Sequence, residues 1–376
     1  MRIGIDARYL SHGIMGGINS YLRNLLPALF DAAKNHNIYL YADTKNPFEL
    51  TELPRNVVLR LVDYRTGLSS LYYDYFLKRT MAKDKLDIAH LPANRGFGPG
   101  QSQSVVTLHD EINIMPLLQI YAGHPKNLRT LTWMTYLHMH SKQSVRKANL
   151  IVTISNYARQ QILRWGGLPE DKVVVIYHGR PTNVQKVTDV SELERVKRLY
   201  GISKDYALAD ALKNPAVIVR AWKLLPEDMR REKEIVFFSR RESVLPEVHE
   251  AVEAGYAKLI LRPEREELNA LYSMATIFVF PSWIEGFGIP LLEAMLCGTP
   301  IIASNRGAIP EVLGEVGLVM DAEDETKLAD YLESLFTSPD ERDRLRKLGF
   351  LRVQKFSWNE SATQLLGVYQ NLIVQK

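Results

Sequence analysis

Two glutamates, Glu285 and Glu293, flank a glycine-rich turn in the segment FVFPSWIEGFGIPLLEAMLCGTPII, residues 278–302, with seven residues between them. An ionised carboxylate only accepts hydrogen bonds, so each of these side chains can hold hydroxyl groups but not a phosphate. A nucleotide sugar offers hydroxyls on both sides of a diphosphate, on the sugar and on the ribose. The alternative is a solvated loop residue at Glu285 and, at Glu293, a charge that complements the dipole of a helix.

The turn between the glutamates has the features of a phosphate-binding site. A strand is predicted over 275–282, followed by Gly286 and Gly288, which let a bulky ligand approach the backbone. Pro290 falls in the first turn of the next helix, where a missing N–H is harmless. The free N–H groups and the dipole at that helix start favour an anion. We therefore expect a diphosphate to bind where this helix begins.

The composition is that of a globular protein with room for two domains. The chain has 376 residues, of which 46% are hydrophobic and 24% charged. No apolar run approaches the roughly 20 residues of a membrane span, and Asp6 and Arg8 interrupt the apolar start in a way that is unlike a secretory signal. A single cysteine, Cys297, allows no intramolecular disulfide and no cysteine-based metal site. We expect a reducing, cytoplasmic location.

Charge is spread unevenly along the chain. Residues 1–178 hold 21 Lys+Arg and 13 Asp+Glu, a balance of +8, whereas the remainder holds 26 and 30, a balance of −4. A basic first half is expected to meet an anionic partner, such as nucleic acid, anionic lipid or a phosphorylated substrate. A solvated basic surface without a partner explains the same numbers equally well.

Short apolar runs alternate with helical patterns throughout, which predicts parallel sheets covered by helices on both faces. The pattern restarts after about residue 180, so we expect two similar α/β units with a hinge near 179–182. Ligands of such sheets bind outside the carboxyl ends of the strands. The strands predicted in the first unit are 2–7, 38–43, 57–62, 88–92, 104–110, 150–155 and 172–179.

The segment PSWIEGFGIPLLEAMLCGTPIIASNRGAIPEVLGEVGLVMDAEDETKLA, 281–329, resembles the donor-binding segment of the retaining glycosyltransferases of family four. Further similar segments are MRIGIDARYL…GGINSYLRNLLPAL, VVTLHDEINIMP, KVVVIYHG and FSWNESATQLLGVY, in the family's order. The resemblance implies the GT-B fold, two Rossmann-like domains facing across a deep cleft, with the C-terminal helix crossing back to the first domain. We expect an acceptor domain over 1–178 plus the helix 359–376, and a nucleotide-sugar donor domain over 179–358.

The resemblance also implies roles for individual residues. Glu285 would contact the donor hexose and Glu293 the ribose hydroxyls. His109, at the end of a predicted strand, would contact the donor sugar and the charge that develops on it, although a lone histidine there is more often a packing residue. The remaining donor-binding candidates, which approach the sugar and diphosphate mainly through their backbone, are Gly16, Gly17, Gly286, Phe287, Gly288 and Ile289.

One region departs from the family pattern. The family has an arginine and a lysine in the loop after the first strand of the second domain, and both clamp the diphosphate. Lys213 matches the lysine, but Ala207, Leu208 and Ala209 stand where the glycine and arginine are expected. Arg240, which follows the predicted strand EIVFFS, is the candidate for the missing charge. We take Lys213, His109 and Glu285 as the candidate catalytic residues.

Neither a metal nor a cofactor is expected. No Asp-x-Asp follows a strand to bridge a cation to the diphosphate; Lys213 and the amides of helix starts would supply the positive charge instead. Retaining transfer without an obvious nucleophile favours front-face displacement, in which the leaving diphosphate takes the proton of the incoming hydroxyl. Positioning and leaving-group stabilisation are then the protein's main contributions.

The leading prediction is a glycosyltransferase that moves a hexose from a GDP- or UDP-linked sugar to a hydroxyl of a glycan or lipid-linked acceptor in cell-envelope polysaccharide synthesis. The alternatives are a GT-B-like epimerase, an inverting transferase, or a non-catalytic partner that binds nucleotide sugars. Nucleic acid is not an expected partner. The aromatic and basic stretches 68–85 and 126–147 predict either contact with an anionic membrane at its inner face or helices that face the core and expose charge.

Overall fold

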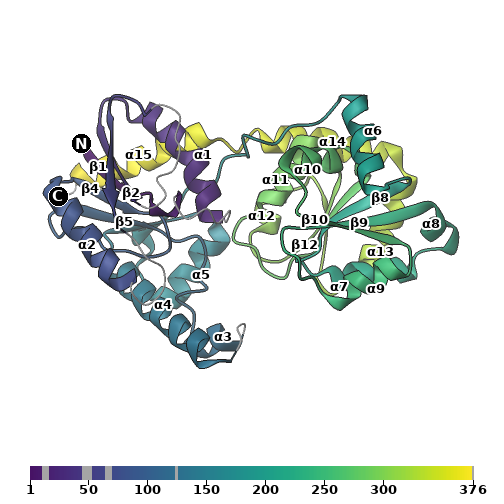
Figure 1. Ribbon diagram of the computed structural model, residues 1–376, viewed down its shortest axis with the longest axis horizontal. Helices are drawn as coiled ribbons and strands as arrows, with labels where there is room; N and C mark the ends of the chain where they lie inside the picture. The colour runs from purple at the N-terminus through teal and green to yellow at the C-terminus, as the bar shows by residue number, and fades with distance from the viewer. Residues whose placement is uncertain (11–16, 45–52, 64–69, 123–125, 375–376) are drawn as a thin grey trace. The chain divides into compact units, whose positions relative to one another are not determined.

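The computed structural model describes residues 1–10, 17–44, 53–63, 70–122 and 126–374. The chain divides into two compact units, drawn in Figure 1: unit 1 is Met1–Gly179 with Ser357–Lys376, and unit 2 is Arg180–Phe356. The sequence predicts a second unit over 179–358, so its first boundary differs from the observed one by one residue and its second by two.

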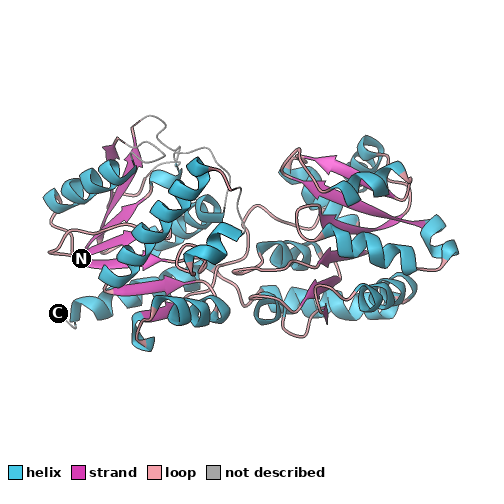
Figure 2. Ribbon diagram, turned by 90° about the horizontal axis from the view of Figure 1, so that it is seen from below, coloured by secondary structure: helices cyan, strands magenta, loops and turns pink. Residues whose placement is uncertain are grey.

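Unit 1 is built on a seven-stranded sheet with the order β3-β2-β1-β4-β5-β6-β7, and its strand pairs are parallel. Helices lie on both sides of the strands (Figure 2), as the sequence predicts. The strands are β1 (Arg2–Asp6), β2 (Asn37–Asp43), β3 (Val57–Val62), β4 (Ile88–Leu91), β5 (Gln103–Thr107), β6 (Leu150–Thr153) and β7 (Val173–Val175). The helices are α1 (Gly17–Ala32), α2 (Ser70–Lys83), α3 (Leu117–Ala122), α4 (Leu128–Lys147), α5 (Asn156–Gly166) and α15 (Trp358–Val374), with 3-10 turns η1 (Arg8–Leu10) and η2 (Glu170–Lys172).

Unit 2 repeats this architecture with a six-stranded parallel sheet in the order β10-β9-β8-β11-β12-β13. Its strands are β8 (Asp205–Asp210), β9 (Lys233–Ser239), β10 (Ala257–Leu261), β11 (Ile277–Phe280), β12 (Ile301–Ser304) and β13 (Leu318–Met320). Its helices are α6 (Val190–Tyr200), α7 (Pro215–Leu224), α8 (Glu227–Glu232), α9 (Pro246–Glu253), α10 (Arg265–Met274), α11 (Ile289–Cys297), α12 (Ile309–Leu313), α13 (Glu325–Thr337) and α14 (Pro339–Val353).

The central strands are short apolar runs because helices cover both of their faces. Every residue of β4, β11 and β12 is buried, as expected for parallel strands. Helix–strand alternation places the carboxyl ends of all strands of a sheet at one edge, where ligands of such folds bind. Among the residues that the structure describes, none of the helices combines the length and apolar character that a membrane span requires.

The C-terminal helix α15 belongs to unit 1, as the GT-B resemblance implies. It lies alongside α1 (Figure 1), and both helices contribute to one apolar core cluster. A buried hydrogen bond of 2.6 Å joins the Tyr369 hydroxyl to Nδ1 of His90 on β4. The other ring nitrogen of His90 lies 2.7 Å from the hydroxyl of Thr107. Burial, with a smaller contribution from His109, lowers the pKa of His90 to about 3, so the ring is neutral at pH 7.

We expect Tyr369→Phe to destabilise unit 1, because it leaves Nδ1 of His90 buried without a partner. Such a loss costs about 1–3 kcal/mol and should lower the Tm in differential scanning calorimetry by at least about 2 °C. Tyr331→Phe is the matched control, since that hydroxyl makes only a 3.4 Å contact with the Val319 carbonyl. Equal Tm values for the two variants would contradict the anchoring role of Tyr369.

Candidate active site

The loop that carries Glu285 joins β11 to the start of α11 in unit 2. Gly288 is the N-cap of α11, with a φ of 96°, and no side chain of the described residues caps the helix. Phe287 is buried and packs edge-on against Phe356, with ring centroids 5.7 Å apart. The helix start is therefore fixed by packing and presents backbone rather than a capping side chain, which suits the anion site predicted there.

Lys213 and Glu285, predicted separately as catalytic residues, form an ion pair. Lys213 lies in the loop after β8 and Glu285 in the loop after β11, and these strands are neighbours in the sheet. The two side chains are 34% and 14% exposed, and Ser282 donates its hydroxyl to Glu285 Oε1 at 3.2 Å. A carboxylate and an ammonium group thus stand together beside the start of α11, in reach of solvent.

Asn214 fixes the loop that carries Lys213. Its backbone is left-handed, with φ 53° and ψ 52°, a conformation that asparagine tolerates better than most residues. Its side-chain amide donates to the carbonyls of Pro281, at 3.1 Å, and Ala322, at 2.8 Å. One side chain therefore ties together the chain segments that follow β8, β11 and β13.

The expectation that Ala207, Leu208 and Ala209 occupy this loop was wrong. They lie inside β8 and are fully buried, because YALA is the apolar run of a central parallel strand. The loop itself is short and runs from Ala211 to Asn214. It contains Lys213 but no arginine that could clamp a diphosphate.

Arg240, the candidate for the missing charge, lies close enough to Asp210 to act on it electrostatically. It is exposed and directly follows β9. Burial raises the pKa of Asp210, the last residue of β8, while a backbone hydrogen bond from Leu212 and the charges of Lys213 and Arg240 oppose that rise. Asp210 was not among the predicted site residues, although its place at the carboxyl end of a strand is a signal that could have selected it.

Glu293 is buried one turn into α11 and is paired on both carboxylate oxygens. Arg265, the first residue of α10, donates to Oε1 at 2.8 Å, and the Tyr272 hydroxyl lies 3.3 Å from Oε2. Glu293 is only 2% exposed, whereas the Arg265 side chain is 27% exposed. A carboxylate so held keeps spare acceptor capacity in a fixed orientation. Sequence reasoning missed both partners because they lie more than 20 residues away.

Gly307 allows the Glu285 loop to lie against the turn after β12. Its φ is 63°, and a Cβ at this position would stand 2.4 Å from the carbonyl oxygen of Glu285 and 2.7 Å from its nitrogen. The next residue, Ala308, donates its N–H to that carbonyl at 2.9 Å. Gly307 was not among the predicted site residues. Its place shortly after the apolar run TPIIAS, 299–304, is the sequence signal that could have identified it.

His109 lies in unit 1, two residues after the end of β5, and is buried. Its Nε2 is 2.9 Å from the Pro92 carbonyl, and its backbone N–H donates to Asn94 Oδ1 at 2.7 Å. Burial lowers the pKa of His109 to about 4, so the neutral ring donates from Nε2 to the carbonyl. Of the glycine pair, Gly17 begins α1 with open space around it, and Gly16 lies outside the described residues.

Within the described part of the chain, no group of three or more His, Cys, Asp or Glu side chains is arranged to hold a metal ion. The cations near the predicted diphosphate position are side chains, namely Lys213, Arg240 and Arg265.

Comparisons with known proteins identify the family of the chain. The family model for glycosyl transferases group 1 matches residues 207–351, and the model for glycosyltransferase family 4 matches residues 15–184. The chain belongs to glycosyltransferase family 4. It is a glycosyltransferase with the GT-B fold, and the two models cover most of both units.

Relatives of this glycosyltransferase include the O-antigen chain mannosyltransferase B of Escherichia coli, 28% identical over 72% of this chain and 71% of that protein. A D-inositol 3-phosphate glycosyltransferase of Corynebacterium efficiens is 32% identical over 53% of this chain and 51% of its own length. Among solved structures, sucrose-phosphate synthase from Thermosynechococcus elongatus aligns over 100% of both chains with a TM-score of 0.75 and 20% identity. WaaG, a glycosyltransferase involved in lipopolysaccharide biosynthesis, aligns over 96% of this chain and 99% of its own with a TM-score of 0.70 and 14% identity.

We expect Gly307→Ala to displace the Glu285 loop, because the added methyl group would overlap backbone atoms that cannot rotate away. Amide hydrogen exchange at Ala308 should become at least about tenfold faster, because its N–H loses the hydrogen bond to the Glu285 carbonyl. Gly255→Ala is the matched control, since Gly255 also has a positive φ of 79° but nothing within 4 Å of its Cβ position. Unchanged exchange at Ala308 in Gly307→Ala would refute the close packing of these loops.

Proposed function

We propose that this glycosyltransferase is a retaining enzyme that transfers a hexose from a GDP- or UDP-linked sugar to a hydroxyl group of a glycan or lipid-linked acceptor. The observation that carries the proposal is the Lys213–Glu285 ion pair beside the uncapped start of α11. Such a pair offers, in one place, a cation for a diphosphate and an acceptor for sugar hydroxyls.

The diphosphate would lie where positive groups gather. The start of α11 supplies backbone amides, and Lys213 and Arg240 supply full charges. These groups stabilise the negative charge that develops on the leaving diphosphate, so the transfer needs no metal ion. Glu293, which Arg265 holds in place, would accept hydrogen bonds from the ribose hydroxyls.

The ion pair between Lys213 and Glu285 balances the charge of each group before the donor binds. When the diphosphate arrives, Lys213 would turn to it, and Glu285 would accept hydroxyls of the hexose. Front-face displacement would then follow, with the leaving diphosphate oxygen taking the proton of the acceptor hydroxyl. His109 of unit 1 is a neutral ring and would not act as a base in this scheme.

The named relatives narrow the substrates. The similarity to an O-antigen chain mannosyltransferase favours mannose as the hexose and a cell-envelope polysaccharide as the acceptor.

The most direct test of the proposed reaction is to supply GDP-mannose with a mannan oligosaccharide and to read the anomeric configuration of the product by NMR. A product with inverted configuration would overturn the retaining mechanism.

Glu285→Gln should lower kcat by about 100-fold or more, since it removes the charged acceptor beside the developing positive charge. The affinity for the free nucleoside diphosphate should stay within about threefold, because that ligand has no hexose for Glu285 to contact. The control is Glu315→Gln, an exposed glutamate of the same unit. Measurements of kcat and of nucleotide affinity by calorimetry separate the two effects, and full turnover in Glu285→Gln would contradict the assigned role.

Helix α2 suggests how the enzyme would approach a lipid-linked acceptor. Leu77 and Met81 pack into the core of unit 1, while Tyr72 and Phe76 are 59% and 40% exposed, close along the helix to basic Arg79. Exposed aromatic rings beside cations suit the interface of an anionic membrane.

Tyr72→Ser/Phe76→Ser should reduce sedimentation of the protein with phosphatidylglycerol vesicles several-fold, because the variant lacks the two exposed rings. Sedimentation equal to that of the wild type would argue against this contact.

A further inference from the structure

Unit 1 contains a cavity of about 520 Å³ that the proposed transfer reaction does not use. It is lined by α2, by the segment 96–104 and by the end of α4 with the residues that follow it. Gln103 begins β5 and Asn149 directly precedes β6, so this part of the lining is at the amino ends of these strands. His109 lies beyond the carboxyl end of β5. The volume is in the range of small-molecule sites.

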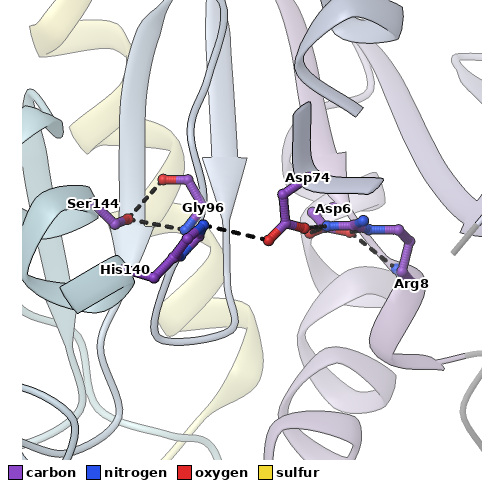
Figure 3. A network of polar contacts seen from close by, with 6 residues as sticks. All are labelled: Asp6, Arg8, Asp74, Gly96, His140 and Ser144. Atoms are coloured by element: carbon purple, nitrogen blue, oxygen red, sulfur yellow. Dashed lines mark hydrogen bonds and ion pairs between the residues drawn. The ribbon is translucent and has the colours of Figure 1, made fainter. Parts of the chain in front are cut away.

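Buried polar contacts hold the walls of this cavity in place. Arg8 donates to both carboxylate oxygens of Asp6 and to Asp74 of α2 at 2.6 Å (Figure 3). Ser144 of α4 both donates to and accepts from the backbone of Gly96, at 2.6 and 2.9 Å. The site is therefore built before any ligand arrives, which reduces the ordering that binding would require.

His140 lines the cavity with hydrogen-bonding capacity that the described residues do not use. It is 4% exposed, and neither ring nitrogen has a hydrogen-bond partner in the described structure. Figure 3 shows Nε2 directed at Asp74, where the distance to Oδ2 is 3.6 Å, longer than a hydrogen bond. Burial lowers the pKa of His140, so the ring is neutral at pH 7 and offers one donor and one acceptor. Buried polar groups without partners are rare and call for an explanation.

The charge of the lining is positive. Lys78 of α2 and Lys147 of α4 both line the cavity, and no carboxylate of the described residues forms an ion pair with either. Asp74, the carboxylate in the wall, shares Arg8 with Asp6, so these three residues carry a net charge of −1, and the two lysines leave the cavity and its wall with a net charge of +1. Tyr75 and Phe97 add aromatic surface to the same cavity, and Lys147 Nζ lies 5.5 Å from the centroid of the Phe97 ring. Two free cations beside aromatic rings and an unused imidazole suit an anion that also carries hydroxyl groups.

We propose that this cavity binds a phosphorylated sugar, with the phosphate held by Lys78 and Lys147 and a sugar hydroxyl hydrogen-bonded to His140. The phosphate chemistry follows from the lysines alone, whereas the sugar chemistry rests on the proposed transfer to a glycan. The ligand is either a free sugar phosphate or the sugar-phosphate headgroup of a lipid-linked saccharide. Its site is separate from the cluster of Lys213 and Glu285.

Binding is tested by calorimetry on the full chain without donor, using mannose 6-phosphate, inorganic phosphate and mannose. Mannose 6-phosphate should bind at least about tenfold more tightly than either of the others. Lys78→Met and Lys147→Met should each weaken it by about tenfold, and so should His140→Phe, which keeps a ring of similar shape. Lys83→Met and Lys142→Met are the matched controls, since these lysines lie on the same helices but do not line the cavity.

The outcomes separate this proposal from the proposed function. No binding of mannose 6-phosphate, or binding that the Lys78 and Lys147 variants leave unchanged, would overturn the site. Inorganic phosphate binding as tightly as mannose 6-phosphate would overturn the sugar part. If His140→Phe does not fold, the affinities of the Lys78→Met and Lys147→Met variants for mannose 6-phosphate still test the site. Vesicles that carry a polyprenyl-phosphate mannose distinguish the lipid headgroup from the free sugar phosphate. Sugar-phosphate binding in a chain that transfers no hexose would support this site while refuting the proposed reaction.

Discussion

The site of unit 2 depends on hydrogen bonds that tie together the loops at the carboxyl ends of its strands. Asn214 reaches two carbonyls from the loop after β8, and the Ser304 hydroxyl at the end of β12 donates to the Ser282 carbonyl at 2.6 Å. Ala308 then holds the Glu285 carbonyl. Parallel strands bring these loops to one edge, but only such cross-links fix their side chains to the precision that group transfer requires.

Charge compensation explains how two glutamates can stand beside an anion site in the folded chain. Each carboxylate has its own cation, Lys213 for Glu285 and Arg265 for Glu293. The two pairs differ mainly in the burial of the carboxylate: the Glu293 side chain is 3% exposed and the Glu285 side chain 14%, whereas Arg265 and Lys213 are 27% and 34% exposed. Removing one member of an enclosed pair is costly because the other charge is left without compensation. The Glu293 pair is therefore suited to a fixed contact, and the Glu285 pair to one that is exchanged when a ligand enters.

The parts of the fold that could be predicted from the sequence are those encoded locally. Apolar runs predicted the strands, and Gly288 with Pro290 predicted the start of α11, because each signal spans a few residues. Lys213 and Glu285 were selected singly, and their pairing was not foreseen. Asn214 and Gly307 were missed, because their partners are set by the tertiary fold; the carbonyls that Asn214 holds lie 67 and 108 residues away. The error at 207–209 came from matching a family loop where the apolar pattern already indicated a strand.

The same reasoning accounts for the difference between the two units. The features of unit 2 that indicate a nucleotide-sugar donor are concentrated in one segment of the chain, where glycines, a proline and two glutamates occur in a fixed order. The cavity of unit 1 takes its lining from α2, the 96–104 segment and α4, which are not consecutive, and so no short motif marks it. A basic first half was visible in the composition, but its assignment required the structure, which shows that Asp74 shares Arg8 with Asp6, while Lys78 and Lys147 form no ion pair with a carboxylate of the described residues. Excess charge in a sequence therefore indicates a ligand only once the structure shows which of the charged side chains form no ion pair within the protein.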